Sequence, residues 1–139
     1  MKKIIIVEVE TEEYLNIEKK IPSEISMLYV EDNKVIDEIN FKEDIIKKGR
    51  DLEYFFKKNN IDNEIKIVSD CGVFTKILLE NWIKETQCKV NFNLDDIQEL
   101  EALIREKSNS EIENIYKEYE NHNDSLEQCY DIFKMFCYA

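Results

Sequence analysis

KIIIVEVET, residues 3–11, runs through three isoleucines and a valine and then places Glu8 and Glu10 on either side of Val9. Consecutive β-branched residues favour a buried strand, which we predict for Lys3–Val9. Side chains two residues apart on a strand point to the same face, so the two carboxylates share one side of the strand end. Two interpretations of these carboxylates are equally good: they belong to a functional site, or they lie in solvent at the end of the strand.

After this strand, segments with the apolar spacing of β-strands are followed by segments with the apolar spacing of helices. Residues 24–41, EISMLYVEDNKVIDEINF, form two extended runs around the polar turn EDNK, which predicts a β-hairpin with apolar residues alternating through Ile25, Met27 and Tyr29 and then Val35, Ile39 and Phe41. Further strands are predicted at 64–69 and 88–92. Helices are predicted within 42–60, 72–86, 94–107, 110–120 and 125–136.

The order of these elements predicts an α/β fold in a single domain over residues 1–139. A hairpin followed by strands that alternate with helices is typical of a mixed sheet flanked by helices. With 139 residues, two glycines and one proline, the chain suits one core whose elements are joined by short polar turns. No internal repeat or domain boundary is evident.

Composition restricts location and partners. No apolar run approaches the ~20 residues that span a bilayer, so we expect a cytoplasmic protein without a membrane partner. The four cysteines have no metal-ligand spacing, and we expect reduced, mostly buried thiols, with Cys129 and Cys137 on an apolar helical face; a disulfide stays open. The net charge of −12 argues against broad nucleic-acid binding and fits a partner with a basic surface.

Several motifs in this order resemble the DEDD family of 3′–5′ exonucleases, which has the ribonuclease H-like fold. The family opens with a strand that ends in Asp-x-Glu-Thr, and VEVET supplies Glu8, Glu10 and Thr11. A Glu-Ile-small signature on the second strand matches residues 24–26. Later, IVSDCGVFTKILL matches a strand, a small-residue turn and Phe-Asp-x-x-x-Leu, except that Thr75 stands at the aspartate position.

The last family motif is a histidine followed five residues later by an aspartate on the final helix. His122 and Glu127 have that separation, whereas the flanking apolar residues prefer Asn123 and Gln128. Both registers stay open. The resemblance implies a ribonuclease H-like five-stranded mixed sheet, with three antiparallel strands first and then parallel strands, flanked by helices.

The resemblance also implies a two-metal site. Carboxylates of the family hold two divalent cations that drive phosphodiester hydrolysis, and hard oxygen ligands suit Mg²⁺ or Mn²⁺. In this chain the metal ligands would be Glu8, Glu10, Asp70 and Glu127, with His122 as proton acceptor. Asp70 could replace the carboxylate lost at Thr75, or it could be a helix N-cap, a position that aspartate favours. Asp95 and Asp96 are expected to begin a helix.

The sequence leaves three hypotheses about function, of which the first two follow from the resemblance. The first is metal-dependent 3′–5′ hydrolysis of single-stranded nucleic acid, weak or lost. The second is a catalytically inactive binding or regulatory module that contacts a basic protein, of the kind that phages or mobile elements encode. An acidic domain unrelated to nucleases is the third. Trp82, Tyr116 and Tyr119 lack interleaved cations and are expected in the core.

Overall fold

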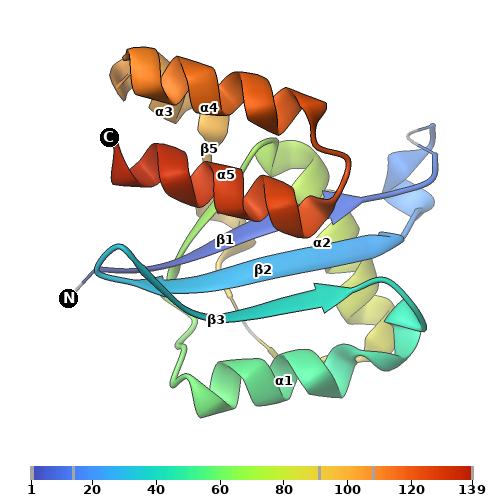
Figure 1. Ribbon diagram of the computed structural model, residues 1–139. Helices are drawn as coiled ribbons and strands as arrows, with labels where there is room; N and C mark the ends of the chain where they lie inside the picture. Colours follow the sequence, from blue (N-terminus) through green and yellow to red (C-terminus); the bar gives the residue numbers. More distant parts are fainter. Residues whose placement is uncertain (1, 14, 91, 108, 139) are drawn as a thin grey trace.

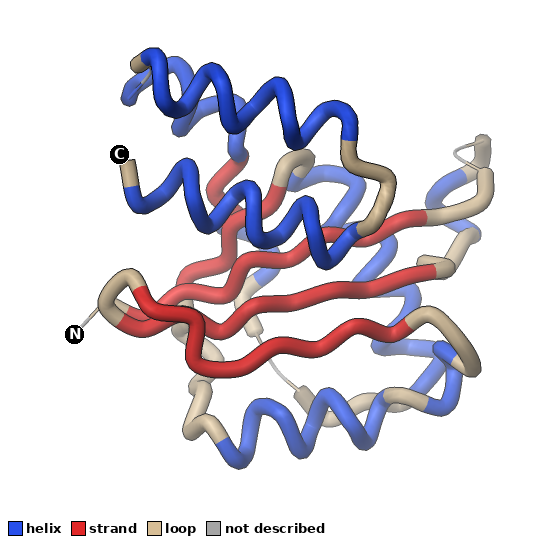
Figure 2. The backbone as a smooth tube through the Cα atoms, in the orientation of Figure 1, coloured by secondary structure: helices blue, strands red, loops and turns tan. Residues whose placement is uncertain are grey.

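The computed structural model describes residues 2–13, 15–90, 92–107 and 109–138. A five-stranded sheet lies between two layers of helices (Figures 1 and 2): α3, α4 and α5 cover one face, and α1 and α2 cover the other. The prediction of an α/β fold with a mixed sheet flanked by helices is confirmed.

The first three strands are antiparallel. β1 (Lys3–Glu10) pairs with β2 (Glu24–Glu31), which pairs with β3 (Lys34–Phe41). Asp32 and Asn33 join β2 to β3 with φ angles of 49° and 64°, the left-handed conformation that a two-residue hairpin turn requires. The predicted hairpin is therefore confirmed, turn included.

The remaining strands run parallel to β1. β4 (Lys66–Ser69) pairs with β1, and β5 (Ile97–Glu99) pairs with β4, giving the order β3-β2-β1-β4-β5. Since parallel strands end at the same edge of a sheet, the carboxyl ends of β1, β4 and β5 lie together there.

The strand predicted at 88–92 is wrong, and residue 91 of that segment lies outside the described residues. Cys88 and Phe92 are buried without strand pairing: the Cys88 thiol donates to the Gly49 carbonyl, and the Phe92 ring lies 5.4 Å from that of Phe56. The apolar residues of this segment therefore close the core, and the fifth strand forms later, within the segment predicted as a helix.

The helices otherwise follow the predicted order. Their bounds are α1 Gly49–Lys58, α2 Gly72–Thr86, α3 Leu100–Lys107, α4 Ser110–Asn121 and α5 Ser125–Cys137. Short 3₁₀ turns lie at η1 Ile17–Lys19, η2 Ile45–Lys47 and η3 Leu94–Asp96. Asp95 and Asp96 thus belong to a 3₁₀ turn that precedes β5 and do not begin α3.

Two cores form because alternate strand residues face opposite layers. Ile5 and Val7 of β1 pack with α1 and α2 residues such as Leu52 and Trp82. Ile4 and Ile6 pack with Ile112 of α4, Ile132 of α5 and other residues on the side of the sheet that α3, α4 and α5 cover. Trp82 and Tyr119 are buried in the core as predicted, and Tyr116 is half-buried and packs against the same core as Tyr119.

The apolar alternation predicted along β3 changes face at one residue. Tyr29 pairs with Asp37 while Val30 pairs with Val35, so Ile36 is an extra residue that forms a β-bulge. Val35 therefore packs with the α4–α5 core, whereas Ile39 and Phe41 pack with the α1–α2 core. The prediction that all three share one face is wrong because periodicity cannot reveal an inserted residue.

All four cysteines are free thiols. Cys129 and Cys88 are buried as expected, but Cys137 is exposed, because it lies at the end of α5 beyond the sheet-facing residues. In the part of the chain that the structure describes, no helix is long and apolar enough to cross a membrane.

Candidate functional site

The predicted acids of β1 lie under the α4–α5 layer. Glu8 and Glu10 continue the row of Ile4 and Ile6, which faces this layer, and Glu8 stands opposite Ser26 of β2. The row changes from apolar to acidic at the carboxyl end of the strand. This is the sheet edge where β1, β4 and β5 end, so the strand geometry brings the predicted residues of β1 and β4 close together.

Glu8 is a buried carboxyl group. Its side chain is 1% exposed, and the Tyr119 hydroxyl of α4 donates a hydrogen bond to Oε1 at 3.2 Å. Burial raises the pKa of Glu8 well above its ordinary value, and the nearby carboxyl of Asp70 raises it further. Glu10 adds a smaller effect in the same direction. The arrangement therefore favours a neutral Glu8.

Tyr119 is the site residue that the sequence did not reveal. Burial, together with Glu8 and Asp70, raises the pKa of its hydroxyl, so the group remains a hydrogen-bond donor. The Tyr116 ring stacks on it with centroids 5.8 Å apart. A tyrosine at core spacing has the same sequence pattern whether or not its hydroxyl finds a buried partner, so periodicity carries no signal for this contact.

Asp70 lies directly after β4 and beside Glu8. Its Oδ1 accepts from the backbone N–H of Cys71 at 2.7 Å and from the Ser69 hydroxyl at 3.4 Å. The helix-cap alternative is wrong: α2 begins at Gly72, and the N-cap residue, Cys71, makes no side-chain cap. The first N–H of α2 instead donates to the Glu99 carboxylate at 3.2 Å.

The position where the family carries an aspartate is filled by a hydroxyl pair. Thr75 is 1% exposed, and its Oγ1 lies 2.6 Å from the Ser69 Oγ. These two groups satisfy each other between β4 and α2. The Thr75 hydroxyl is therefore hydrogen-bonded within the core by Ser69.

His122 and Glu127 form a separate pair at the turn between α4 and α5. The Nδ1 atom of His122 lies 2.5 Å from Oδ2 of buried Asp131, and Nε2 lies 3.8 Å from the Glu127 carboxylate. Asp131 raises the pKa of the imidazole. These side chains line a surface pocket of ≈ 500 Å³, and none of the interactions described for them reaches Glu8.

The alternative register, Asn123 and Gln128, does not supply a ligand pair. Asn123 is exposed. The Gln128 amide donates to the His122 carbonyl at 2.9 Å, which ties α5 to the end of α4. Its Oε1 is buried and has no hydrogen-bond partner among the described residues.

A polar network fixes α5 over the strand end. The hydroxyls of Ser26 and Ser125 lie 2.6 Å apart, and the Asn40 amide donates to Ser26 at 2.5 Å. Asp124 caps the first N–H groups of α5 and accepts from Lys42 at 2.8 Å, a contact that lowers the pKa of its carboxyl. α5 is therefore held on β2 and β3, with Cys129 buried against the sheet.

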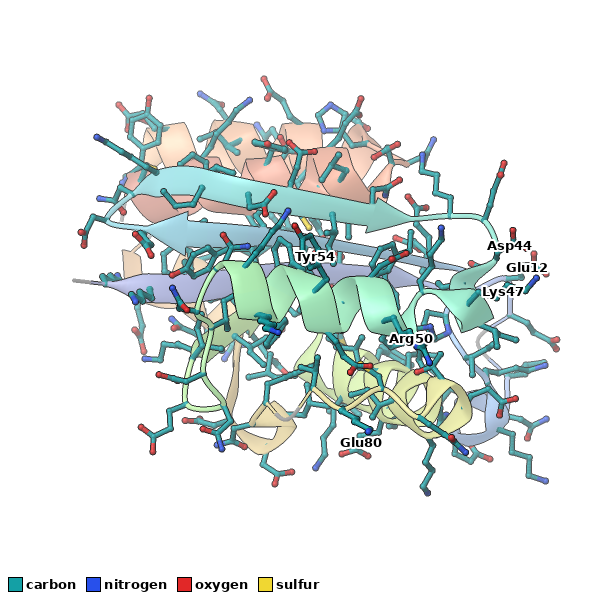
Figure 3. The ribbon with its side chains drawn as sticks, turned by 90° about the horizontal axis from the view of Figure 1, so that it is seen from below. Glu12, Asp44, Lys47, Arg50, Tyr54 and Glu80 are labelled. Atoms are coloured by element: carbon teal, nitrogen blue, oxygen red, sulfur yellow. The ribbon has the colours of Figure 1, made fainter. Side chains whose placement is uncertain are left out.

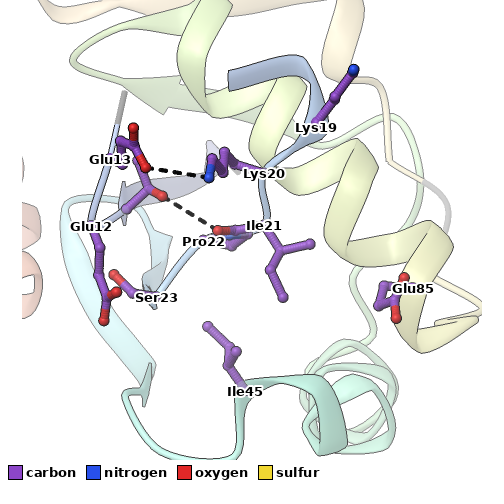
Figure 4. Close-up of a pocket in the computed structure, with 10 residues that line it drawn as sticks. Glu12, Glu13, Lys19, Lys20, Ile21, Pro22, Ser23, Ile45 and Glu85 are labelled. Atoms are coloured by element: carbon purple, nitrogen blue, oxygen red, sulfur yellow. Dashed lines mark hydrogen bonds and ion pairs between the residues drawn. The ribbon is translucent and has the colours of Figure 1, made fainter. Parts of the chain in front are cut away.

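The loop after β1 lines an open pocket (Figure 4). Its volume is ≈ 550 Å³, and an ion pair between Lys20 and Glu13 at 3.4 Å crosses it. The Asn81 amide of α2 holds the far side of the loop by donating to the carbonyls of Ile17, Glu18 and Lys20, at 3.4, 3.2 and 2.7 Å. Both signs of charge line this pocket.

The four predicted metal ligands do not form one cluster. In the part of the chain that the structure describes, no three His, Cys, Asp or Glu side chains are grouped so that they could hold a metal ion. Of the four predicted ligands, Glu8 and Asp70 meet, Glu10 lies beside them, and Glu127 lies with His122.

Neither family models nor curated protein sequences give a match to this chain. Its function therefore has to be argued from the fold and from the groups around Glu8.

Proposed function

We propose that this chain is an exonuclease-like protein of the ribonuclease H-like fold that does not hydrolyse nucleic acid and serves as a binding or regulatory module. Three antiparallel strands followed by parallel ones, with helices on both faces, agree with the sheet that the sequence resemblance implies. The acids of the first motif lie at the strand end where that fold carries its chemistry.

The observation that carries the proposal is the state of Glu8. In a two-metal site this position needs an accessible, ionised carboxylate. Here the group is 1% exposed and accepts a hydrogen bond from Tyr119, and burial together with the nearby Asp70 raises its pKa. The protein thus satisfies this carboxyl group with its own hydroxyl and carboxyl neighbours.

The positions of the exposed glutamates on α3 and α4 indicate what kind of partner this module would bind. The exposed glutamates of α3 and α4 are Glu101, Glu106, Glu111, Glu113, Glu118 and Glu120, while the exposed cations described on these helices are Arg105 and Lys117. A surface of one charge sign attracts the opposite sign and accelerates encounter. We therefore assign a basic protein surface as the partner of the α3–α4 layer.

Metal-dependent 3′–5′ hydrolysis is the second candidate. The observation that favours it is the proximity of two predicted ligands, Glu8 of β1 and Asp70 directly after the neighbouring strand β4. In that case Mg²⁺ or Mn²⁺ would be the cofactor and single-stranded DNA or RNA the substrate.

A nuclease assay separates the two candidates. The purified chain is incubated with end-labelled single-stranded DNA and RNA in Mg²⁺ or Mn²⁺, beside an active 3′–5′ exonuclease as positive control. We expect no release of nucleotides. Metal-dependent release that disappears in Glu10→Gln and in Asp70→Asn would overturn the proposal and establish the second candidate.

The partner class has its own test. Binding to an immobilised arginine-rich peptide is compared for a Glu106→Gln, Glu111→Gln variant and for a Glu43→Gln, Glu85→Gln variant, which removes the same charge from exposed positions elsewhere. We expect the first pair to weaken binding more than the second. Equal losses would show that only net charge matters and would contradict a specific α3–α4 surface.

A further inference from the structure

The outer side of α1 differs in charge from the rest of this acidic molecule. Lys47, Arg50, Lys57 and Lys58 are exposed along one side of η2 and α1, and Tyr54 stands among them with 65% of its surface exposed. Figure 3 shows Lys47, Arg50 and Tyr54 on the side of the helix that faces away from the sheet. We call these five residues the α1 stripe.

The stripe follows from the way α1 packs. Leu52, Phe55 and Phe56 are buried against the sheet, and the helical period leaves Arg50, Tyr54 and Lys57 on the opposite side. Gly49 lets the start of the helix approach α2, since a Cβ atom there would lie 3.0 Å from the Thr86 Cβ. The stripe is therefore held rigidly on a packed helix.

Three cations of the stripe have no carboxylate partner among the described residues: Lys47, Arg50 and Lys57. Lys58 pairs with Asp37 at 2.9 Å, and its ammonium lies 5.3 Å from the centre of the Tyr54 ring. The acids near the stripe include Asp44, whose backbone carbonyl accepts from the Lys47 N–H at 2.8 Å, Asp51, which pairs with Lys48 at 3.8 Å, and Glu53. The centre of the stripe is thus cationic and aromatic.

We propose that the α1 stripe binds single-stranded nucleic acid, with the cations on phosphates and the Tyr54 ring stacked on a base. Arg50 and Lys57 are seven residues apart, about 10 Å along a helix, so they reach different phosphates. An exposed aromatic ring between cations is the combination that holds unpaired bases without sequence preference.

Other anionic partners would contact fewer of the groups that the stripe offers. An acidic peptide pairs with the cations but offers no flat ring to Tyr54. An anionic membrane needs an apolar helix face to insert, and the exposed apolar residues here are limited to Tyr54 and Ile46. The stripe lies on the sheet face opposite Glu8, and its binding does not depend on whether the chain hydrolyses nucleic acid.

Fluorescence anisotropy with labelled oligo(dT) and oligo(U) tests the proposal, in EDTA to exclude hydrolysis and at low salt because the net charge of −12 opposes a polyanion. With three unpaired cations on phosphates, the logarithm of affinity should fall with the logarithm of salt concentration with a slope of about −2. Arg50→Gln should make this slope smaller in magnitude by about 0.7.

Substitution of the ring separates stacking from charge. Tyr54→Ala should weaken binding roughly tenfold to a hundredfold, the effect of one lost stacked base, while Tyr54→Trp should retain it. Matched controls are Tyr138→Ala, which removes another exposed ring, and Lys134→Gln, which removes an exposed cation from α5. Both should bind like the unchanged protein.

Three results would overturn the proposal. The first is no binding of either oligonucleotide at low salt by the folded, full chain. The second is an equal loss in the stripe variants and in their controls. The third is binding of an oligoglutamate peptide or of phosphatidylserine vesicles with the same dependence on Tyr54, which would assign the stripe to that partner.

Discussion

At the scale of single residues, the buried Glu8 carboxyl group couples folding to pH. The folded chain keeps the proton of Glu8 above the ordinary pKa of 4.5, while the unfolded chain releases it. The folded state thus binds more protons, and stability contributed by Glu8 falls as pH rises from 4.5 toward the raised pKa of the folded state. The cost is largest at pH values above the raised pKa of the folded state.

We predict that Glu8→Gln is more stable than the unchanged protein at pH 8 and that this advantage shrinks toward pH 5. Glutamine keeps the shape, accepts from Tyr119 and can donate to Asp70 without the cost of a buried charge. Urea unfolding at several pH values measures the difference. Glu12→Gln, at an exposed position, is the control and should show no such trend; an advantage that is constant with pH would contradict a protonated Glu8.

His122 is the one histidine of the sequence, so its titration can be followed by NMR without overlap from other imidazoles. Asp131 raises the pKa of His122 above its ordinary value of 6.5, so the imidazole signal in an NMR titration should report a midpoint above 6.5. Asp131→Asn should lower the midpoint, and Glu127→Gln should lower it less because that carboxylate is 3.8 Å away. A midpoint unchanged by Asp131→Asn would show that the contact does not form in solution.

At the scale of secondary-structure elements, the sequence predicted those strands and helices whose apolar residues recur at a regular spacing. Strand β1, the hairpin and the helices α1, α2, α4 and α5 follow from alternating or helical spacing and were confirmed, whereas the helix predicted within 94–107 begins only at Leu100. The fifth strand was missed because Cys88 and Phe92 are apolar for reasons of core closure, while the three residues of β5 are too few to form a pattern.

The candidate site was predictable only in part. The spacing of Glu8 and Glu10 placed them on one face, and strand order brought Asp70 to the same edge. Neither the burial of Glu8 nor its hydrogen bond from Tyr119 could be predicted, since both depend on how α4 packs across the strand end. The same holds for the pairing of His122 with Asp131, which joins the residue after α4 to a residue of α5 nine positions later.

The loop between β1 and β2 gives a prediction at this scale. The Asn81 amide donates to three loop carbonyls, so Asn81→Ala should leave them without this donor, lower the free energy of unfolding by about 1–2 kcal/mol and loosen residues 15–23. Limited trypsin digestion measures the loosening, since Lys19 and Lys20 lie in the loop. Asn114→Ala on the exposed side of α4 should not change cleavage there; unchanged cleavage in Asn81→Ala would contradict the prediction.

At the scale of the whole molecule, charge is segregated, with glutamates on α3 and α4 and cations on the outer side of α1. The net charge of −12 repels itself in the compact state, and salt screens this repulsion. The overall charge was evident from the sequence, but its division between the two helix layers required the fold.

We predict that the melting temperature rises with added NaCl and that a Glu106→Gln, Glu111→Gln, Glu120→Gln variant melts higher than the unchanged protein at low salt. The gain should shrink at high salt. Lys84→Gln, Lys117→Gln, Lys134→Gln, also at exposed positions, should melt lower at low salt. Differential scanning calorimetry at two salt concentrations measures both variants, and a gain independent of salt would exclude self-repulsion as the cause.

The bulge at Ile36 has a consequence for how copies of the molecule behave at high concentration. β3 is the last strand on its side of the sheet, and its eight residues leave one row of backbone N–H and C=O groups without a neighbouring strand. A straight edge of this length recruits strands from other chains and seeds aggregation. The inserted residue bends and twists β3 near its start, and Asp37 and Glu38 follow it, so the exposed edge is divided into two shorter segments that are poor templates for another strand.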